Sequence, residues 1–403
     1  MHQARAGGFL AKHEGVDSGN RRPPLPVLTT LRFFAAAEVL VYHAPGLDGI
    51  SSHFIRDLFS AGYQAVTFFF VLSGFILTYA YTGRSERDYL NASTRSFWRS
   101  RIARIAPTYF FALLVGLPAF LYGALVAKIV SVEHLILGLA LIPAFMQAWW
   151  PPVAFLWNGP AWSLSVEFFF YAIFPALACL TSRLPRGLFL VLAFALVVAT
   201  AVARATMQTS LEFATDPVAR SNFELYFPIF HLPQFIFGIA LGRVYLFGPI
   251  ISARLHVSML YVGAGLLIVL FGFRSNLPEW VSWLRTDAGL ALLFGLVIFG
   301  GARTEGRNLK MLACPALVLL GEASYAMYIL HTPIYFWWHW ITAKAMGWSL
   351  PLLVDLFFSV TLVTGASILI YLHVEKPLRR WLTDDRRQLG GTLRIDSGTR
   401  IRT

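Results

Sequence analysis

The sequence predicts an all-α polytopic membrane protein, a helix bundle of about ten transmembrane helices around an internal cavity. Of the 403 residues, 57% are hydrophobic and only 13% are charged, whereas about 25% of the residues in a soluble globular chain are charged. Stretches without ionisable residues recur along the chain, and most can hold the roughly 20 apolar residues of a helical span. Some spans nevertheless contain ionisable residues, which usually face a protein interior rather than lipid.

Ten spans are expected in chain order, each in an apolar stretch between charged residues. Their ranges are 27–46, 61–82, 104–126, 161–181, 187–204, 225–246, 255–273, 286–301, 316–341 and 352–374. The segment 132–150 is also apolar, but a crossing there would put the basic loops of the two halves on opposite sides. Because Lys and Arg favour cytoplasmic loops, we expect this segment to lie at the outer face or to re-enter from it.

The same rule predicts the orientation and the domain limits. Arg and Lys collect between the predicted spans in 83–103, 182–186 and 302–315, and again near the C-terminus. Both termini are therefore expected to be cytoplasmic. We expect a cytoplasmic N-terminal tail at 1–26, one transmembrane domain at 27–382 and a cytoplasmic C-terminal tail at 383–403.

Composition argues against several other classes of protein. The net charge of +12 follows the membrane topology, so it does not indicate a nucleic-acid partner. Cys179 and Cys314 lie within or beside apolar segments and offer neither a disulfide framework nor metal-ligand spacing. The sequence contains no GxGxxG, P-loop or HExxH motif, so no metal cofactor is expected, and nucleotide hydrolysis has no support.

The stretch 28–44 of the first span contains three ionisable side chains. Arg32 and His43 are eleven positions apart, which amounts to three helical turns plus about 20° and a rise of roughly 16 Å. Both therefore point to one face of the helix. Glu38 lies about 140° from His43 on the same wheel, and we expect it to serve helix packing.

A second basic group stands at the start of the third span. Arg101 and Arg104 are separated by three positions and share one helix face. One interpretation is an anchor at the lipid headgroups. The other is a clamp for phosphate groups, which the forked guanidinium suits, and Arg32 on the cytoplasmic portion of the first span would join it.

Glu167 lies about one and a half turns into the fourth span, in the stretch WSLSVE. Ser163 and Tyr171 lie four positions before and after it, on the same helix face. The carboxylate either holds a helix pair together or, since it shares the outer half of the membrane with His43, orients that imidazole and raises its basicity.

Two further spans carry small or polar residues. Ser73 and Gly74 lie inside the second span, where close helix packing is the favoured interpretation. The ninth span places four polar or aromatic residues on one face by their spacing: Ser324, Tyr328, His331 and Tyr335. For His331, a structural role within the bundle and a place in the cavity lining are equally compatible with the sequence.

Taken together, the motifs resemble the acyltransferase-3 family of bacterial membrane O-acyltransferases over nearly all of residues 27–382. Three positions depart from the family pattern: Thr30 stands in place of a common acidic residue, and Phe168 and Phe169 stand where Glu and Gln often follow the motif Glu. The resemblance rests on six motifs in order: Arg32 with His43, FFFVLSGF (68–75), RIARIAPTY (101–109), WSLSVE (162–167), SYAMYILHTP (324–333) and EKP (375–377).

The resemblance implies transfer of an acyl group, commonly acetyl, from cytoplasmic acyl-coenzyme A to a hydroxyl of a glycan or lipid-linked sugar at the bacterial inner membrane. It implies a catalytic role for His43, as general base or acyl relay, and for Glu167. Arg32, Arg101 and Arg104 would bind the donor. The candidates for contact with substrate are Ser73, Trp162, Ser163, Tyr328 and His331.

Two other functions agree less well with the sequence. A transporter or flippase of a lipid-linked sugar also uses intramembrane charges, but such folds often show repeated halves or broken helices, which the sequence does not display. A purely structural membrane scaffold would not need Arg32 and His43 on one face of a span.

Overall fold

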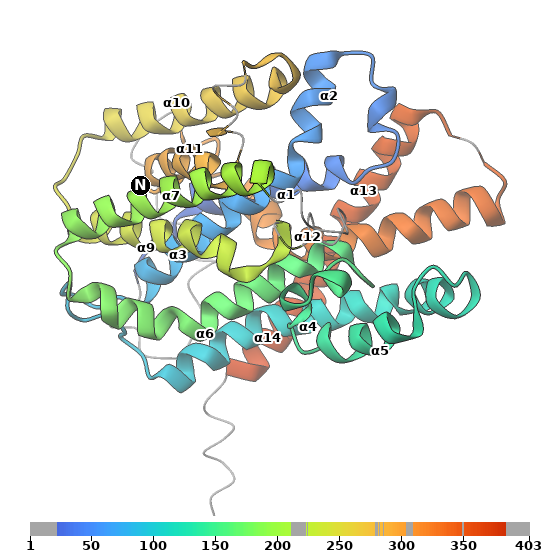
Figure 1. The fold of residues 1–403 in the computed structure, drawn as a ribbon, viewed down its shortest axis with the longest axis horizontal. Helices are drawn as coiled ribbons and strands as arrows, with labels where there is room; N and C mark the ends of the chain where they lie inside the picture. Colours follow the sequence, from blue (N-terminus) through green and yellow to red (C-terminus); the bar gives the residue numbers. More distant parts are fainter. Residues whose placement is uncertain are drawn as a thin grey trace, which may run out of the picture.

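The protein is a bundle of helices (Figure 1). A computed structural model describes residues 22–210, 223, 225–278, 281, 283, 284, 286–303, 309–348 and 350–383. Within this part of the chain there is no β-strand. Seven of its helices are long and apolar enough to cross a membrane, so the all-α fold is confirmed and the chain is a multi-pass membrane protein.

Ten helices coincide with the ten predicted spans. Seven of the ten are the long apolar helices mentioned above, and the other three are α1, α11 and α12. Helices α1 and α11 are shorter, with 17 and 15 residues. The ten are α1 (Pro26–Tyr42), α3 (Ala65–Tyr81), α4 (Thr94–Leu121), α6 (Trp162–Ser182), α7 (Arg186–Ser210), α9 (Leu232–Phe247), α10 (Ala253–Gly272), α11 (Asp287–Gly301), α12 (Pro315–His339) and α13 (Leu352–Ile370).

Short π-helical turns extend three of these helices. Tyr122–Val126 continues α4, Trp340–Ala345 continues α12, and Tyr371–Glu375 joins α13 to α14 (Lys376–Thr383). A further helix, α2 (His53–Ser60), precedes α3. The remaining turns are 3-10: Leu47–Gly49, Gly62–Gln64, Gln147–Trp149, Pro151–Val153, Gly159–Ala161, Pro228–His231 and Arg274–Asn276.

The segment 132–150 does not form a crossing helix. It contains α5 (Val132–Leu141), which has 10 residues and therefore rises about 15 Å, half the thickness of a hydrocarbon core of about 30 Å. Gly138 of α5 faces Phe120 of α4, so the segment folds back along α4 (Figure 1). This agrees with an element that enters the membrane without spanning it.

Helix α4 begins earlier than the charge pattern predicted. The segment 83–103 was expected to be a loop, but the helix starts at Thr94, where the Ser93 hydroxyl accepts a hydrogen bond of 3.2 Å from the Ser96 N–H. Arg95, Arg99 and Arg101 of this segment are on the helix, whereas Arg84 and Arg87 precede it. As a result Arg101 and Arg104 lie about two to three turns inside α4.

Glycine contacts bring α3 and α9 together. A Cβ atom added to Gly74 would lie 2.1 Å from the Phe235 carbonyl oxygen, and one added to Gly238 would lie 2.0 Å from the Val71 carbonyl oxygen. Only glycine allows the two backbones to approach this closely. The packing interpretation of Gly74 is therefore confirmed.

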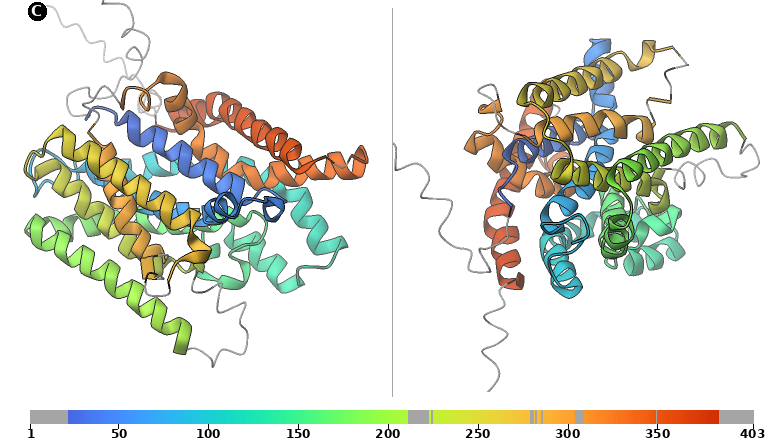
Figure 2. Two further views of the ribbon diagram at one scale, coloured as in Figure 1. Left: turned by 90° about the horizontal axis from the view of Figure 1, so that it is seen from above. Right: turned by 90° about the vertical axis from the view of Figure 1, so that its left-hand side faces the viewer.

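Close contacts also establish the relative direction of α1 and α12. Gly321 lies against the backbone of Thr29, and farther along both helices the Tyr335 hydroxyl donates to the Leu40 carbonyl at 3.0 Å. The two helices are thus parallel, as spans one and nine must be when ten crossings alternate. In the left view of Figure 2, α1 lies between α10 and α13.

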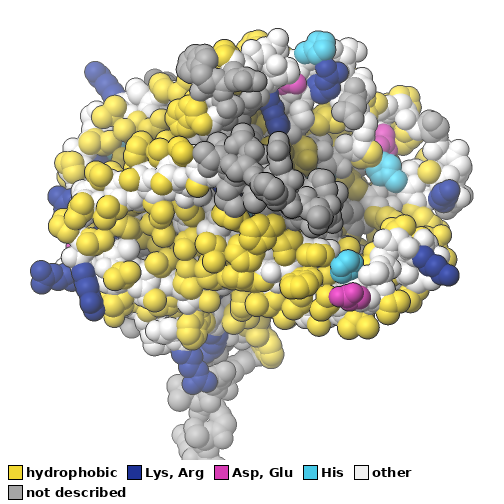
Figure 3. Space-filling view, viewed as in Figure 1, with side chains coloured by type: hydrophobic (Ala, Val, Ile, Leu, Met, Phe, Trp, Pro, Cys, Tyr) yellow, Lys and Arg dark blue, Asp and Glu magenta, His cyan; other side chains and the backbone are white. Residues whose placement is uncertain are grey.

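The outer surface of the bundle is apolar. Hydrophobic side chains cover the middle of the face in Figure 3, and Lys and Arg lie mostly at its margins. Val191, Leu192 and Phe194 of α7 and Val262 and Leu266 of α10 are exposed. Such a surface fits contact with lipid.

Candidate active site

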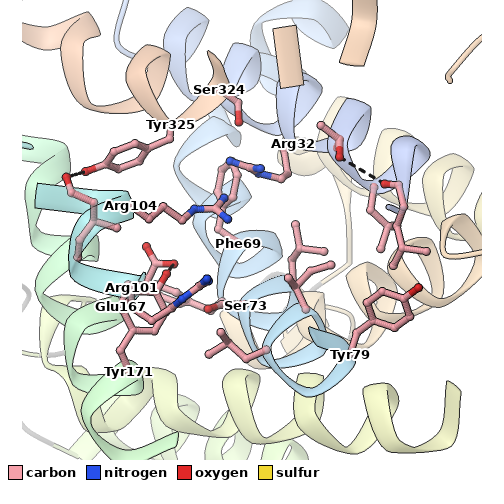
Figure 4. A pocket seen from close by; sticks show the side chains of 18 of the residues that line it. Arg32, Phe69, Ser73, Tyr79, Arg101, Arg104, Glu167, Tyr171, Ser324 and Tyr325 are labelled. Carbon is pink, nitrogen blue, oxygen red and sulfur yellow. Dashed lines mark hydrogen bonds between the residues drawn. The ribbon is translucent and has the colours of Figure 1, made fainter. Parts of the chain in front are cut away.

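A cavity of about 340 Å³ lies among α1, α3, α4, α6 and α12 (Figure 4). Its volume is at the lower end of the range of about 300–1,000 Å³ that ligand sites occupy. Leu28, Phe69 and Ile76 contribute apolar walls. The polar lining consists of Arg22, Thr29, Arg32, Ser73, Tyr79, Arg101, Arg104, Ser163, Glu167, Tyr171, Ser324, Tyr325 and Tyr328.

Three predicted arginines meet at this cavity. Arg32 of α1 and Arg104 of α4 extend toward one another, and Arg101 lies below them beside Glu167 (Figure 4). Arg101 also lies over the ring of Tyr81, 5.3 Å from its centroid. The interpretation of these residues as a clamp for phosphate groups requires the three side chains to meet, and all three line the cavity.

The charge of the lining is unbalanced. Four arginines line the cavity, whereas Glu167 is the only carboxylate among the described lining residues. Guanidinium groups bind phosphate and carboxylate groups in bidentate geometry. The cavity is suited to a ligand with an anionic end and an apolar stem.

Glu167 belongs to the arginine cavity and not to the His43 end. Its Oε1 accepts a hydrogen bond of 2.5 Å from the Tyr171 hydroxyl, and Figure 4 places the carboxylate beside Arg101. No hydrogen bond or ion pair joins it to His43 in the described part of the chain. Shared depth in the membrane predicted their contact, but the face of α6 that carries Ser163, Glu167 and Tyr171 turns toward the arginines.

His43 caps the C-terminal end of α1. Its Nδ1 lies 3.0 Å from the Val39 carbonyl oxygen, and because a carbonyl only accepts, Nδ1 carries the proton of the neutral ring. The lone pair is then on Nε2, as a general base requires. The half-buried ring contacts Tyr42 and His331, with centroid separations of 4.7 and 4.9 Å.

The polar face of α12 is buried as predicted, with Ser324, Tyr328, His331 and Tyr335 all inside the bundle. Ser324 and Tyr328 line the cavity. His331 lies one turn beyond, its ring centroid 6.2 Å from that of Tyr328. Neither His331 nor His43 is part of the lining, so the two imidazoles lie just past the Tyr328 end of the cavity.

The other predicted substrate contacts divide into two groups. Ser73 and Ser163 line the cavity, and the Ser163 hydroxyl lies 2.8 Å from the Tyr328 hydroxyl. Trp162 does not line it: its ring packs against Tyr226 and His231, with centroid separations of 5.0 and 5.3 Å. Because Trp162 is one position from Ser163, the two side chains point about 100° apart around the helix axis. This explains why Ser163 lines the cavity and Trp162 does not.

The sequence did not single out Arg22 as a cavity residue. Residues 22–25 were assigned to an N-terminal tail, but they line the cavity. The Arg22 guanidinium donates to the carbonyls of Tyr79 and of Gly83, the latter at 2.7 Å, and the Tyr79 hydroxyl donates to the Pro23 carbonyl at 2.8 Å. A basic residue before a Pro-rich stretch gave no signal of this contact. Residues 1–21 and 384–403 lie outside the described part.

Glu375 was also missed as a site residue. It is buried, accepts a hydrogen bond of 3.3 Å from Thr108, and interacts electrostatically with Arg104 and Arg32. The EKP motif contains it, but no local pattern predicts that the π-helical turn Tyr371–Glu375 brings it to the arginines. Pi-helical turns are frequent at functional sites.

No cluster of three or more His, Cys, Asp or Glu side chains suited to a metal is found among the described residues. Cys179 and Cys314 are free thiols. The chemistry that the site offers comes from arginines, hydroxyl groups, Glu167 and the two imidazoles.

The chain was compared with known proteins. A family model described as an acyltransferase domain matches residues 26–372. The chain is similar to Acyltransferase MdmB of Streptomyces mycarofaciens, at 29% identity over 382 residues, which cover 89% of this chain and 92% of that protein. No solved structure matches the chain.

Two more relatives carry informative names. Exopolysaccharide production protein ExoZ of Rhizobium meliloti is 28% identical over 335 residues, covering 80% of this chain and 91% of its own length. O-acetyltransferase OatA of Staphylococcus aureus is 22% identical over 378 residues, covering 88% of this chain and 57% of its own length.

Proposed function

The chain belongs to the acyltransferase-3 family and is a membrane O-acyltransferase, and we propose that it transfers an acyl group, most simply acetyl, from acyl-coenzyme A to a hydroxyl of a glycan or lipid-linked sugar. The observation that carries the proposal is the cavity in which Arg32, Arg101 and Arg104 converge. Coenzyme A has phosphate groups at one end and a long, flexible pantetheine arm that ends in the thioester.

The donor matches both the cationic part and the apolar part of the cavity. Arg101, Arg104 and Arg32 bind the phosphate groups through charge-assisted hydrogen bonds. The pantetheine arm lies along the apolar walls of Phe69 and Ile76 and extends toward Tyr328. Along α1, the roughly 16 Å from Arg32 to His43 is comparable with the reach of that arm.

His43 supplies the base. Its Nε2 takes the proton of the acceptor hydroxyl as the oxygen attacks the thioester carbon, and the departing coenzyme A thiolate later recovers a proton from the imidazolium. A relay in which Nε2 itself carries the acyl group for a moment uses the same lone pair. Glu167, beside Arg101, acts at the donor end in this proposal.

The proposal also includes the acceptor, the membrane in which the protein resides and its orientation there. The names of two relatives refer to exopolysaccharide production and to O-acetyl transfer, which supports a glycan hydroxyl as acceptor. We propose that the protein resides in the bacterial inner membrane with both termini in the cytoplasm. The arginine cavity then receives cytoplasmic donor, and His43 acts toward the outer side.

Coenzyme A binding to the purified full-length protein in lipid nanodiscs tests the proposal. Arg101→Ala and Arg104→Ala each remove a charged hydrogen-bond donor worth about 1.5–3 kcal/mol, so we expect Kd to rise roughly 10- to 100-fold. Arg84→Ala, at an exposed loop position, is the matched control and leaves Kd unchanged.

His43→Ala separates binding from chemistry. This variant should bind coenzyme A like the native protein and fail to acylate the surface glycans of cells that depend on it, as read by mass spectrometry. A native protein that does not bind coenzyme A would refute the proposal and favour transport of a lipid-linked sugar.

A further inference from the structure

The imidazole of His331 is buried, and its nitrogens lack well-formed hydrogen bonds. Its exposed fraction is 0%, and neither ring nitrogen makes a hydrogen bond of regular geometry among the described residues, although the ring interacts with the backbone of Tyr328 and Met327 in the preceding turn. Native structures rarely leave a buried donor or acceptor without a well-formed hydrogen bond. A neutral imidazole always presents one N–H and one lone pair, so the N–H of His331 is poorly satisfied inside the bundle.

This poorly satisfied donor lies next to the proposed base. The rings of His331 and His43 have centroids 4.9 Å apart and planes inclined by 43°, and no hydrogen bond joins their nitrogens. His43 Nδ1 is committed to Val39, which leaves its Nε2. Two adjacent rings therefore carry a free lone pair and a poorly satisfied N–H, just past the Tyr328 end of the cavity.

Three hydrogen bonds fix the part of α12 that carries His331. The Asn158 amide donates to the Ile329 carbonyl at 2.8 Å, and the Tyr328 and Ser163 hydroxyls lie 2.8 Å apart. On the other side, the Tyr335 hydroxyl donates to the Leu40 carbonyl at 3.0 Å. A donor held from both sides in this way is preorganised, which is the condition under which it stabilises a transition state strongly.

We propose that His331 is a second catalytic residue, whose N–H donates a hydrogen bond to the thioester carbonyl oxygen while His43 accepts the proton from the acceptor. The inference rests on the proposed function and deepens it.

The acceptor oxygen forms a bond to the thioester carbon as its proton moves to His43 Nε2, and the carbonyl oxygen becomes an oxyanion bound by the His331 N–H. The oxyanion then collapses, the carbon–sulfur bond breaks, and the coenzyme A thiolate takes the proton from His43. Because the negative charge on the carbonyl oxygen develops in the transition state, the hydrogen bond from His331 raises kcat more than it lowers KM.

The test uses the full-length protein in nanodiscs, with acetyl-coenzyme A as the donor probe and glycan extract from cells that lack the protein as acceptor. Thiol release gives kcat and KM, and a separate titration gives Kd for coenzyme A. We expect His331→Phe, which keeps an aromatic ring without the donor, to lower kcat about 100- to 1,000-fold with KM and Kd changed less than threefold. His331→Asn keeps an N–H and should recover at least tenfold of that loss.

His256→Phe is the matched control, because His256 is a buried histidine of α10 that bonds the Phe299 carbonyl, away from the cavity; its kcat should stay within threefold of native. Native kcat in His331→Phe overturns the inference, as does equal loss in the Asn and Phe variants. If His331→Phe does not fold, His331→Asn decides alone: a kcat more than tenfold above that of His43→Ala supports the donor role, and an equal one refutes it. If the native protein neither binds coenzyme A nor releases thiol, the proposed function itself fails.

Discussion

At the scale of single residues, Glu167 gives the cavity its one negative charge among the described lining residues. Its carboxylate is held by Tyr171 at 2.5 Å and lies beside Arg101 (Figure 4). A carboxylate in this position repels the phosphate groups of a donor and also limits the repulsion among the arginines. The first effect acts directly on the ligand, so we expect it to dominate donor affinity.

Glu167→Gln should therefore tighten coenzyme A binding by about tenfold, equivalent to ~1.4 kcal/mol. Titration of the native and variant proteins at constant ionic strength checks this, because charge effects weaken with salt. Tyr171→Phe removes the hydroxyl and keeps the charge, so it should not tighten binding. Weaker binding by Glu167→Gln would mean that the carboxylate mainly supports the arginines.

Helical periodicity was enough to predict which residues of one helix share a face. It grouped Arg32 with His43, Arg101 with Arg104, and Ser163 with Glu167, and in the last two pairs both members do line the cavity. It did not predict which face of α6 turns to which neighbour, because depth in a membrane leaves the rotation of a helix undetermined. The Glu375 contact, 267 positions from Thr108 in the chain, had no local signal.

At the scale of helices, the apolar stretches predicted the ten ranges well because each span must satisfy its own backbone hydrogen bonds in lipid. The start of α4 was missed because its first turns contain arginines that face the membrane surface. A stretch rich in charged residues was interpreted as a loop, although it is helical. Packing partners depend on small residues, and only Gly74 of the α3–α9 contact was singled out.

That contact leads to a prediction on stability. Gly238→Ala places a Cβ about 2 Å from the Val71 carbonyl oxygen, and overpacking of this kind costs about 1–3 kcal/mol. We expect the variant to lose folded protein at a lower temperature than native in a detergent melting assay.

Gly365→Ala is the matched control for that assay. Gly365 lies within α13 and an added Cβ meets nothing within 4 Å, so the variant should melt at or above the native temperature because alanine favours helix. Equal melting of the two variants would contradict the close approach of α3 and α9.

At the scale of the whole molecule, the arrangement has two functional ends. The side chains of Arg32, Arg101 and Arg104 line the cavity. The rings of His43 and His331 lie just past its Tyr328 end. Helices α1 and α12 run parallel and contribute to both ends. In the proposed mechanism the phosphate groups of the donor stay at the arginines, and the pantetheine arm carries the acyl group along α1 to the imidazoles, across the bilayer in the proposed orientation.

The proposed orientation requires the loop after α1 to be outside and the loop between α3 and α4 to be inside. Ser51 and Ser85 are exposed in these two loops, so Ser51→Cys and Ser85→Cys report on them in a protein whose Cys179 and Cys314 are replaced by serine. In spheroplasts, a membrane-impermeant maleimide should label the first variant at once and the second only after permeabilisation. The reverse pattern would turn the arginine cavity away from cytoplasmic acyl-coenzyme A, and labelling of both without permeabilisation would mean that α3 does not cross.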